Sequence, residues 1–330
     1  MTEAQPENGR PERLRIGMYW AASCGGCDIS LLEIGEHLLE LIEAADVVFW
    51  PCVADFKYRD VAAYPDGYLH ACFFNGAIRS SEHEEVARLL RRKSRTLVAY
   101  GVCAMDGGIP ALANLNTPRG IFEAAYHNNP SLSNPAGIEP QHLTPTPYGD
   151  LELPRFYPQV LRLADIVPVD YRIPGCPPQA YQVWRVLEAL VAGEVPARNN
   201  AALVGCDNRS VCDECTREKR KARIKDFKRP HLQLPEPNWC LLEQGFVCLG
   251  PATRSGCGAL CPAANLTCRG CYGASGAADD QGTAMLSALG SMFDATTEER
   301  ARELAAQVAD PVGTFYRFGL ASSVLKGIRS

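Results

Sequence analysis

The sequence predicts an α/β protein, in which a doubly wound, mostly parallel sheet is followed by a loop-rich segment and C-terminal helices. Strand-like and helix-like patterns alternate through the first 200 residues. Residues 212–271 then show little clean periodicity but contain eight cysteines, and helical patterning resumes over residues 283–308. We expect a flexible N-terminus over 1–12, the sheet domain over 13–200, a cysteine-rich domain over 201–275 and a C-terminal helical segment over 276–330.

Each expected element rests on the spacing of its apolar residues. Short apolar runs predict strands over 13–20, 47–50, 69–75 and 96–101, with a weaker one over 164–168. Amphipathic spacing predicts helices over 30–43, 82–93 and 181–190 in the first domain, and over 283–289 and 297–308 after it. We expect this order of elements to form a flavodoxin-like sheet domain.

Two stretches lack such patterns. Residues 114–158 are rich in Pro, Asn and Thr, so we expect an irregular excursion over the surface of the first domain. Excursions of this length are usually functional or form interfaces, which makes this stretch a candidate for binding a partner. Residues 197–208 have the composition of a linker into the second domain.

The composition is that of an ordinary globular protein. Hydrophobic residues make up 46% of the 330 residues and charged residues 22%, enough for two domains with buried cores. The net charge of −5 gives no electrostatic basis for a nucleic-acid surface. No run approaches the roughly 18 apolar residues of a membrane span, and residues 1–12 lack the apolar region of an export signal. We therefore expect a cytoplasmic protein without a membrane span.

Eight of the 15 cysteines lie within residues 212–271. Disulfides are disfavoured, because the chain is long, can bury a hydrophobic core without them and is expected in a reducing compartment. Eight thiolates are the number that two cubane iron–sulfur clusters need. Zinc is a more serious alternative to iron–sulfur clusters than disulfides are, because Cys-x-x-Cys pairs also bind zinc. Spacing alone does not separate zinc from iron.

Four more cysteines lie in three loops of the sheet domain, each just after an expected strand or just before a helix. They are Cys24, Cys27, Cys103 and Cys176. Because such loops meet at the carboxyl edge of a parallel sheet, we expect four thiolates at one place, where a third cluster would fit. A thioredoxin-type dithiol would need only the first two cysteines, and no phosphate-binding Gly-x-x-x-x-Gly-Lys motif is present. Asp28 and Glu33 are expected to cap the following helix, or else to influence this site.

The eight later cysteines divide by order into two blocks of four. The first block is Cys212, Cys215, Cys240 and Cys248, and the second is Cys257, Cys261, Cys268 and Cys271. Sequential blocks are the preferred partition, and interleaving, as in two-cluster ferredoxins, is the alternative. Metal ligands rather than an apolar core are expected to organise this segment. Cys72 is expected in the core, whereas Cys52 and Cys206 have no assigned role.

These motifs resemble the small, electron-transferring subunit of nickel–iron hydrogenases. The matching elements are Cys24-Gly-Gly-Cys27, Gly101-Val-Cys103-Ala, Pro174-Gly-Cys176-Pro-Pro and the segment from Cys240 to Cys271. The chain is most similar to the cytoplasmic, methyl-viologen-reducing and deazaflavin-non-reducing type that associates with heterodisulfide reductase. Cys212-Asp-Glu-Cys215 and the spacing from Cys240 to Cys248 carry that finer likeness. Other branches often have histidine at the first of these positions and proline at that of Cys261.

The resemblance implies three [4Fe–4S] clusters and a role for each cysteine. Cys24, Cys27, Cys103 and Cys176 would ligate the proximal cluster, nearest to a nickel–iron centre on a separate large subunit. Cys257, Cys261, Cys268 and Cys271 would ligate the medial cluster, and Cys212, Cys215, Cys240 and Cys248 the distal one. The chain alone would have no catalytic residue. Its partners would be the large subunit and an electron-accepting iron–sulfur or flavin subunit, linked to heterodisulfide reductase.

Three alternatives to this function stay open at the level of sequence. The chain could serve a related hydrogenase paired to an NAD(P) or deazaflavin module. A complex-I-like oxidoreductase subunit would share the sheet domain, but it normally has adjacent cysteines in the first motif and lacks the eight-cysteine extension. A structural zinc protein would be colourless and would contain no iron.

Overall fold

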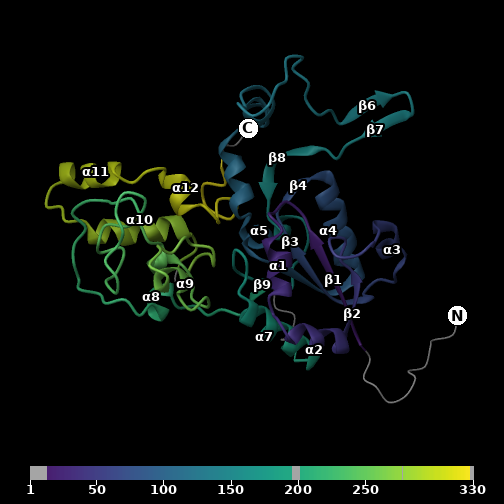
Figure 1. The fold of residues 1–330 in the computed structure, drawn as a ribbon, viewed down its shortest axis with the longest axis horizontal. Helices are drawn as coiled ribbons and strands as arrows, with labels where there is room; N and C mark the ends of the chain where they lie inside the picture. Colours follow the sequence, from purple (N-terminus) through teal and green to yellow (C-terminus); the bar gives the residue numbers. More distant parts are fainter. Residues whose placement is uncertain (1–12, 195–200, 277, 328–330) are drawn as a thin grey trace.

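The computed structural model describes residues 13–194, 201–276 and 278–327, so the expected flexible N-terminus lies outside the described residues. A six-stranded parallel sheet forms the centre of the first domain, with the strand order β10-β9-β5-β3-β1-β2 (Figure 1). Its strands are β1 (Leu14–Trp20), β2 (Ala45–Phe49), β3 (Leu69–Asn75), β5 (Ser94–Tyr100), β9 (Tyr171–Ile173) and β10 (Ala202–Leu203). This is the flavodoxin-like order with one further strand, as predicted. The order reverses between β1 and β3, and ligand sites of open sheets form at that point.

Helices cover both faces of the sheet, because its strands are apolar on both sides. Against one face lie α1 (Gly26–Leu32), α2 (His37–Ala44) and α7 (Ala180–Val191), which pack on Met18, Phe73 and Val98. Against the other lie α3 (Tyr58–Ala63), α4 (Ser81–Lys93) and the 3-10 helix η3 (Leu163–Asp165), which pack on Phe74 and Leu97.

Three sequence-based expectations for this domain are corrected. The single helix expected over 30–43 is two helices, because the chain turns at Gly35, whose φ is +68°. Residues 164–168, expected to form a strand, instead belong to η3 and the turn after it. The strand of this region is β9, which comes later in the chain. The described part of the expected linker, 201–208, contains β10, which extends the sheet by one strand. Strands of two or three residues are too short to show an alternating pattern.

The stretch expected to be irregular is partly ordered and stands off the domain (Figure 1). It leaves α5 (Val102–Asp106) through the 3-10 helix η1 (Ile109–Leu115) and returns along β8 (Phe156–Leu161). We call residues 117–156 the arm. It contains α6 (Pro118–Phe122), the π-helix η2 (Glu123–His127) and the antiparallel hairpin β6 (Leu143–Thr146) and β7 (Gly149–Glu152). At its base, β8 pairs with β4 (Ile78–Ser80).

The cysteine-rich segment has an apolar core, which corrects the expectation that metal ligands alone would organise it. Ile224 and Phe246 are fully buried there, and Met285 and Phe315 of the C-terminal helices pack into the same core. The regular elements of this part are α8 (Val211–Glu214), the 3-10 helix η4 (Gly250–Ala252), α9 (Leu260–Ala263), α10 (Gln281–Met292), α11 (Glu298–Ala306) and α12 (Pro311–Phe315). Across the described ranges, no helix combines the length and the apolar character needed to span a membrane.

Candidate functional site

Three loops bring four cysteines together at the carboxyl edge of the sheet. Cys24 and Cys27 follow β1, Cys103 follows β5, and Cys176 follows β9. The four thiols are close enough for their charges to interact, since Cys27 is affected by the other three and Cys24 also affects Cys103 and Cys176. The sequence-based expectation that these loops converge is met, and their role as ligands stays a prediction.

Glycines let the backbone approach these thiols closely. A Cβ at Gly101 would lie 2.4 Å from the sulfur of Cys27, and a Cβ at Gly108 would lie 2.5 Å from the sulfur of Cys103. Both glycines have positive φ angles, +81° and +58°. The loops therefore form a cradle that any side chain at these two positions would fill.

Burial and mutual repulsion oppose ionisation of these thiols. Burial raises the pKa of Cys27 far above its ordinary value, and the neighbouring thiolates Cys103 and Cys176 raise it further. Burial likewise raises the pKa of Cys103 to about 12. Several thiolates at this edge therefore need a strongly positive group between them, and iron ions of a cluster would supply that charge.

A buried carboxylate lies directly beneath this site. Asp28 is 7% exposed and accepts hydrogen bonds from the Nε1 of Trp50 and the Nδ2 of Asn75, both at 2.8 Å. It does not cap α1, whose N-cap is Gly25, and Glu33 lies at the other end of that helix. The helix-capping interpretation of these two acids is therefore wrong. The sequence does contain a signal for the real partners, because Trp50 and Asn75 stand at the carboxyl ends of β2 and β3.

The first block of later cysteines surrounds one small cavity. Cys212, Cys215, Cys240 and Cys248 all line a space of about 160 Å³. Burial raises the pKa of Cys212 to about 12 and that of Cys248 to about 11. The backbone N–H of Gly250 donates to the Cys248 thiol and lowers this shift. Thiols around a cavity, with amide donors aimed at sulfur, fit the ligand set of a cubane cluster.

The second block lies between the other two groups. Cys257, Cys261, Cys268 and Cys271 are close enough for their charges to interact, and Cys271 also feels the charge of Cys176. Backbone N–H groups of Ala259 and Leu260 donate to Cys257, and that of Gly270 donates to Cys268. Burial raises the pKa of Cys271 to about 12.

Two hydrogen bonds join the three cysteine groups directly. The backbone N–H of Cys176 donates to the sulfur of Cys271, which links the sheet edge to the second block. The backbone N–H of Cys268 donates to the sulfur of Cys248 at 3.2 Å, which links the second block to the first. The three groups therefore stand in the spatial order sheet edge, second block, first block.

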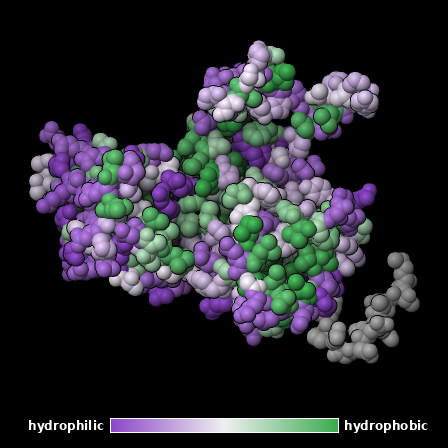
Figure 2. Space-filling model, viewed as in Figure 1, coloured by the Kyte–Doolittle hydropathy of each residue, from purple (hydrophilic) through white to green (hydrophobic). Residues whose placement is uncertain are grey.

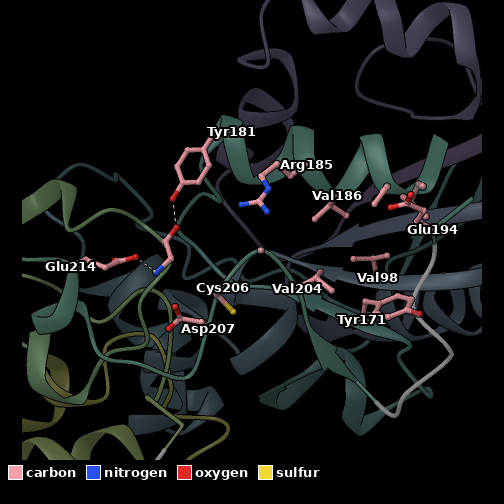
Figure 3. Close-up of a pocket in the computed structure, with 14 residues that line it drawn as sticks. Val98, Tyr171, Tyr181, Arg185, Val186, Glu194, Val204, Cys206, Asp207 and Glu214 are labelled. Atoms are coloured by element: carbon pink, nitrogen blue, oxygen red, sulfur yellow. Dashed lines mark hydrogen bonds between the residues drawn. The ribbon is translucent and has the colours of Figure 1, made fainter. Parts of the chain in front are cut away.

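A further junction holds the peptide that precedes Cys257 (Figure 3). Tyr181 of α7 donates a hydrogen bond to the carbonyl oxygen of Gly256, and the N–H of Gly256 donates to Glu214 at 2.8 Å. Glu214 stands between Cys212 and Cys215 in the chain, so the junction ties all three cysteine groups to one peptide. A cavity of about 490 Å³ opens beside it, and Cys206 lies on its wall. No local sequence pattern indicates this junction, because its members come from three distant segments.

The remaining cysteines are explained more simply. Cys72 is fully buried in β3, which confirms that it is a core residue, whereas Cys52 is exposed. Cys206 packs against Gly256, where a Cβ would lie 2.9 Å from the Cα of Cys206.

Within the described ranges, no three His, Cys, Asp or Glu side chains are grouped for a single metal ion.

Comparison with known proteins defines the class of this chain. The family described as NADH ubiquinone oxidoreductase, 20 Kd subunit, matches residues 24–190, which include the four cysteines of the sheet edge. A solved structure of the Dm. baculatum [NiFeSe]-hydrogenase has the same fold, with a TM-score of 0.51 and 18% identity. That likeness covers 79% of this chain and 95% of the other. The chain is therefore a subunit of an oxidoreductase complex.

Relatives over nearly the whole chain narrow the assignment. The iron-sulfur subunit of the F420-non-reducing hydrogenase of Archaeoglobus profundus is 38% identical, covering 85% of this chain and 88% of that protein. A subunit of the F420-non-reducing hydrogenase of Methanothermobacter marburgensis is 35% identical, covering 95% and 96%. The chain belongs to this family of hydrogenase small subunits, as its sequence motifs predicted.

Proposed function

We propose that this chain carries electrons from dihydrogen oxidation, at a nickel–iron centre on a large-subunit partner, through three [4Fe–4S] clusters to an acceptor subunit. The observation that carries the proposal is the position of the second cysteine block. Its Cys271 accepts a hydrogen bond from the sheet-edge residue Cys176, and its Cys268 donates one to Cys248 of the first block. A relay needs such an intermediate group in contact with both ends.

The proposed ligand sets follow the three spatial groups. Cys24, Cys27, Cys103 and Cys176 would hold the proximal cluster, and Cys257, Cys261, Cys268 and Cys271 the medial one. Cys212, Cys215, Cys240 and Cys248 would hold the distal cluster. The shared cavity of this last set supports sequential blocks over interleaving. Each cluster would accept and release single electrons.

The chain itself would set how readily each site is reduced. Backbone N–H groups that donate to Cys248, Cys257 and Cys268 stabilise negative charge on those sulfurs. Burial of Cys248 and Cys268 keeps water away, whereas Cys24 and Cys261 are exposed. The exposed Cys24 supports a position for the proximal site at the surface that meets the large subunit.

The acceptor is proposed from the relatives. Their name, F420-non-reducing hydrogenase, supports an acceptor other than F420. We propose an iron–sulfur or flavin subunit linked to heterodisulfide reductase, and a cytoplasmic complex. Co-purification of tagged chain with its neighbouring subunits identifies the acceptor, and recovery of an NAD(P)-reducing or F420-reducing module would overturn this choice.

The cluster content is tested on the intact complex, purified without oxygen. We expect this chain to account for about twelve iron and twelve sulfide, beyond the metals of its partner subunits, and for paramagnetic resonance signals of three reduced clusters. Serine variants of Cys215 and Cys261 each remove one cluster, and the signal of the other later cluster stays. Zinc in place of the iron of this chain would refute the relay, and a Cys248→Ser variant that removes a different cluster signal from the Cys215 variant would refute the sequential partition.

A further inference from the structure

The arm presents apolar side chains to solvent without a core of its own. None of the residues between Asn114 and Val160 is buried, and every residue from 140 to 156 is exposed. The exposed fraction is 71% for Ile138 and 100% for Tyr148. A two-stranded hairpin is only marginally stable in water, and monomeric proteins rarely expose apolar groups in this concentration. The arm therefore has the character of one half of an interface.

Polar contacts hold the exposed arm in shape. Glu139 accepts hydrogen bonds from Arg119 at 3.1 Å and lies 2.6 Å from the Nε2 of His127. Asn134 donates to the carbonyl oxygens of Tyr126 and Ile138, and it accepts from the N–H of Ile138. Because these contacts order the arm in advance, its apolar side chains lose little conformational freedom when they bind a partner.

A buried arginine lies at the base of the arm, and among the described residues no carboxylate pairs with its charge. Arg79 of β4 is 8% exposed, and its guanidinium lies 4.0 Å from the centroid of the Phe156 ring. Both terminal nitrogens are buried and lack a hydrogen-bond partner among the described residues. Burial lowers the pKa of Arg79, and no carboxylate in the described part of the chain offsets that effect. A buried cation without an ion-pair partner is unfavourable in the isolated chain, so a carboxylate from a partner protein would stabilise it.

The base of the arm belongs to the same edge of the sheet as Cys24. Ala77, two residues before Arg79, forms a β-bridge with Ala22, two residues before Cys24. An apolar patch covers α1 and α2 on the same view of the molecule as the arm (Figure 2), and exposed side chains there include Ile29 and Leu39. A partner that covers the exposed Cys24 and this patch is within reach of the arm.

We propose that the arm clamps the hydrogenase large subunit and that Arg79 receives a carboxylate from it. This inference rests on the proposed function, because it takes the large subunit to be the protein that covers Cys24. The apolar side chains of the arm bury themselves against that subunit. The carboxylate forms a bidentate ion pair with the two free nitrogens of Arg79 when Phe156 moves aside.

The first test shortens the arm in the intact complex. Leu153 donates a backbone hydrogen bond to His142 at 2.8 Å, so a Gly-Ser pair can replace residues 143–152 without moving either end. We expect the tagged variant to keep its iron content and to retain less than a tenth of the large subunit. The matched control is Leu234→Ser, which removes an exposed apolar side chain (84%) from the cysteine-rich domain. Wild-type retention in the shortened variant would overturn the clamp.

The second test uses Arg79→Met, which keeps the length of the side chain and removes its charge. We expect the full chain without partners to unfold at the same or a higher temperature, because an unpaired buried cation has gone. We also expect at least a tenfold loss of large-subunit retention, with Arg79→Lys in between. A less stable free chain, or undiminished retention, would overturn the role of Arg79. If the variants keep the large subunit but lose self-association or the acceptor subunit, the arm binds that other partner instead. A complex without iron would refute the relay rather than the clamp.

Discussion

The cradle around Cys27 gives the sharpest mutational prediction, Gly101→Ala. The new Cβ would lie 2.4 Å from the sulfur of Cys27, well inside van der Waals contact. Gly101 also has φ 81° and ψ 162°, a conformation that is essentially restricted to glycine. Such backbone strain costs about 1–3 kcal/mol, and overpacking a tight site costs about 1–3 kcal/mol more. We therefore expect a loss of roughly 2–6 kcal/mol in the free energy of unfolding.

Gly35→Ala is the matched control. Gly35 has a φ of +68°, but no atom lies within 4 Å of the place that a Cβ would take, so only the backbone cost of about 1–2 kcal/mol applies. Both variants are compared by denaturant unfolding and by iron analysis of the complex purified without oxygen. Gly101→Ala should lower the iron content of the complex by about four, and Gly35→Ala should leave it unchanged. Equal stability and equal iron in the two variants would refute the cradle.

Three other features can be tested by single substitutions. Asn114→Ala removes the 3.0 Å and 2.7 Å hydrogen bonds that join Asn114 to the backbone of Val160, so it should lower the free energy of unfolding by about 2–4 kcal/mol in denaturant titrations, and an unchanged midpoint would contradict this. Glu214→Gln keeps an acceptor for Gly256 but removes a negative charge beside Cys257; the medial potential should rise in a redox titration followed by paramagnetic resonance, at unchanged iron content. Burial lowers the pKa of His83 in the folded protein, so neutral His83 supports the fold above about pH 6.5 and this stability is lost as the pH falls below that value. His83→Gln should remove this part of the acid sensitivity, measured by unfolding curves recorded across this pH range.

The sequence predicted the sheet well where strands were long and apolar. The strands β1, β3 and β5 each have seven residues, and their positions followed from composition alone. By contrast, β9 and β10 have three and two residues, and they are strands only because neighbouring segments pair with them. The order within the arm was also hidden, because it depends on polar contacts such as those of Glu139 and Asn134 rather than on apolar periodicity.

The candidate site shows the same contrast between features that local sequence reveals and features that only tertiary contacts create. Cysteine is chemically distinctive, so the sequence pointed to four cysteines at the sheet edge and to two later blocks, with sequential blocks preferred over interleaving, and their role as ligands stays a prediction. The surroundings of those groups were not accessible in that way. The buried carboxylate of Asp28 accepts hydrogen bonds from Trp50 and Asn75, which stand at the ends of two other strands, and the guanidinium of Arg79 is covered by Phe156 from the arm. Such features depend on tertiary neighbours that no local pattern records.

The shared core of the cysteine-rich segment and the C-terminal helices has a consequence for biosynthesis. Met285, Leu289 and Phe315 close the same core as Ile224 and Phe246, so that core stays open until Phe315 has left the ribosome. The sheet edge shares this dependence, because Phe318 packs against Val102, Met105 and Cys176, and its carbonyl oxygen accepts a hydrogen bond from the N–H of Gly108. All three cysteine groups therefore reach their final packing only after residue 318 has been synthesised.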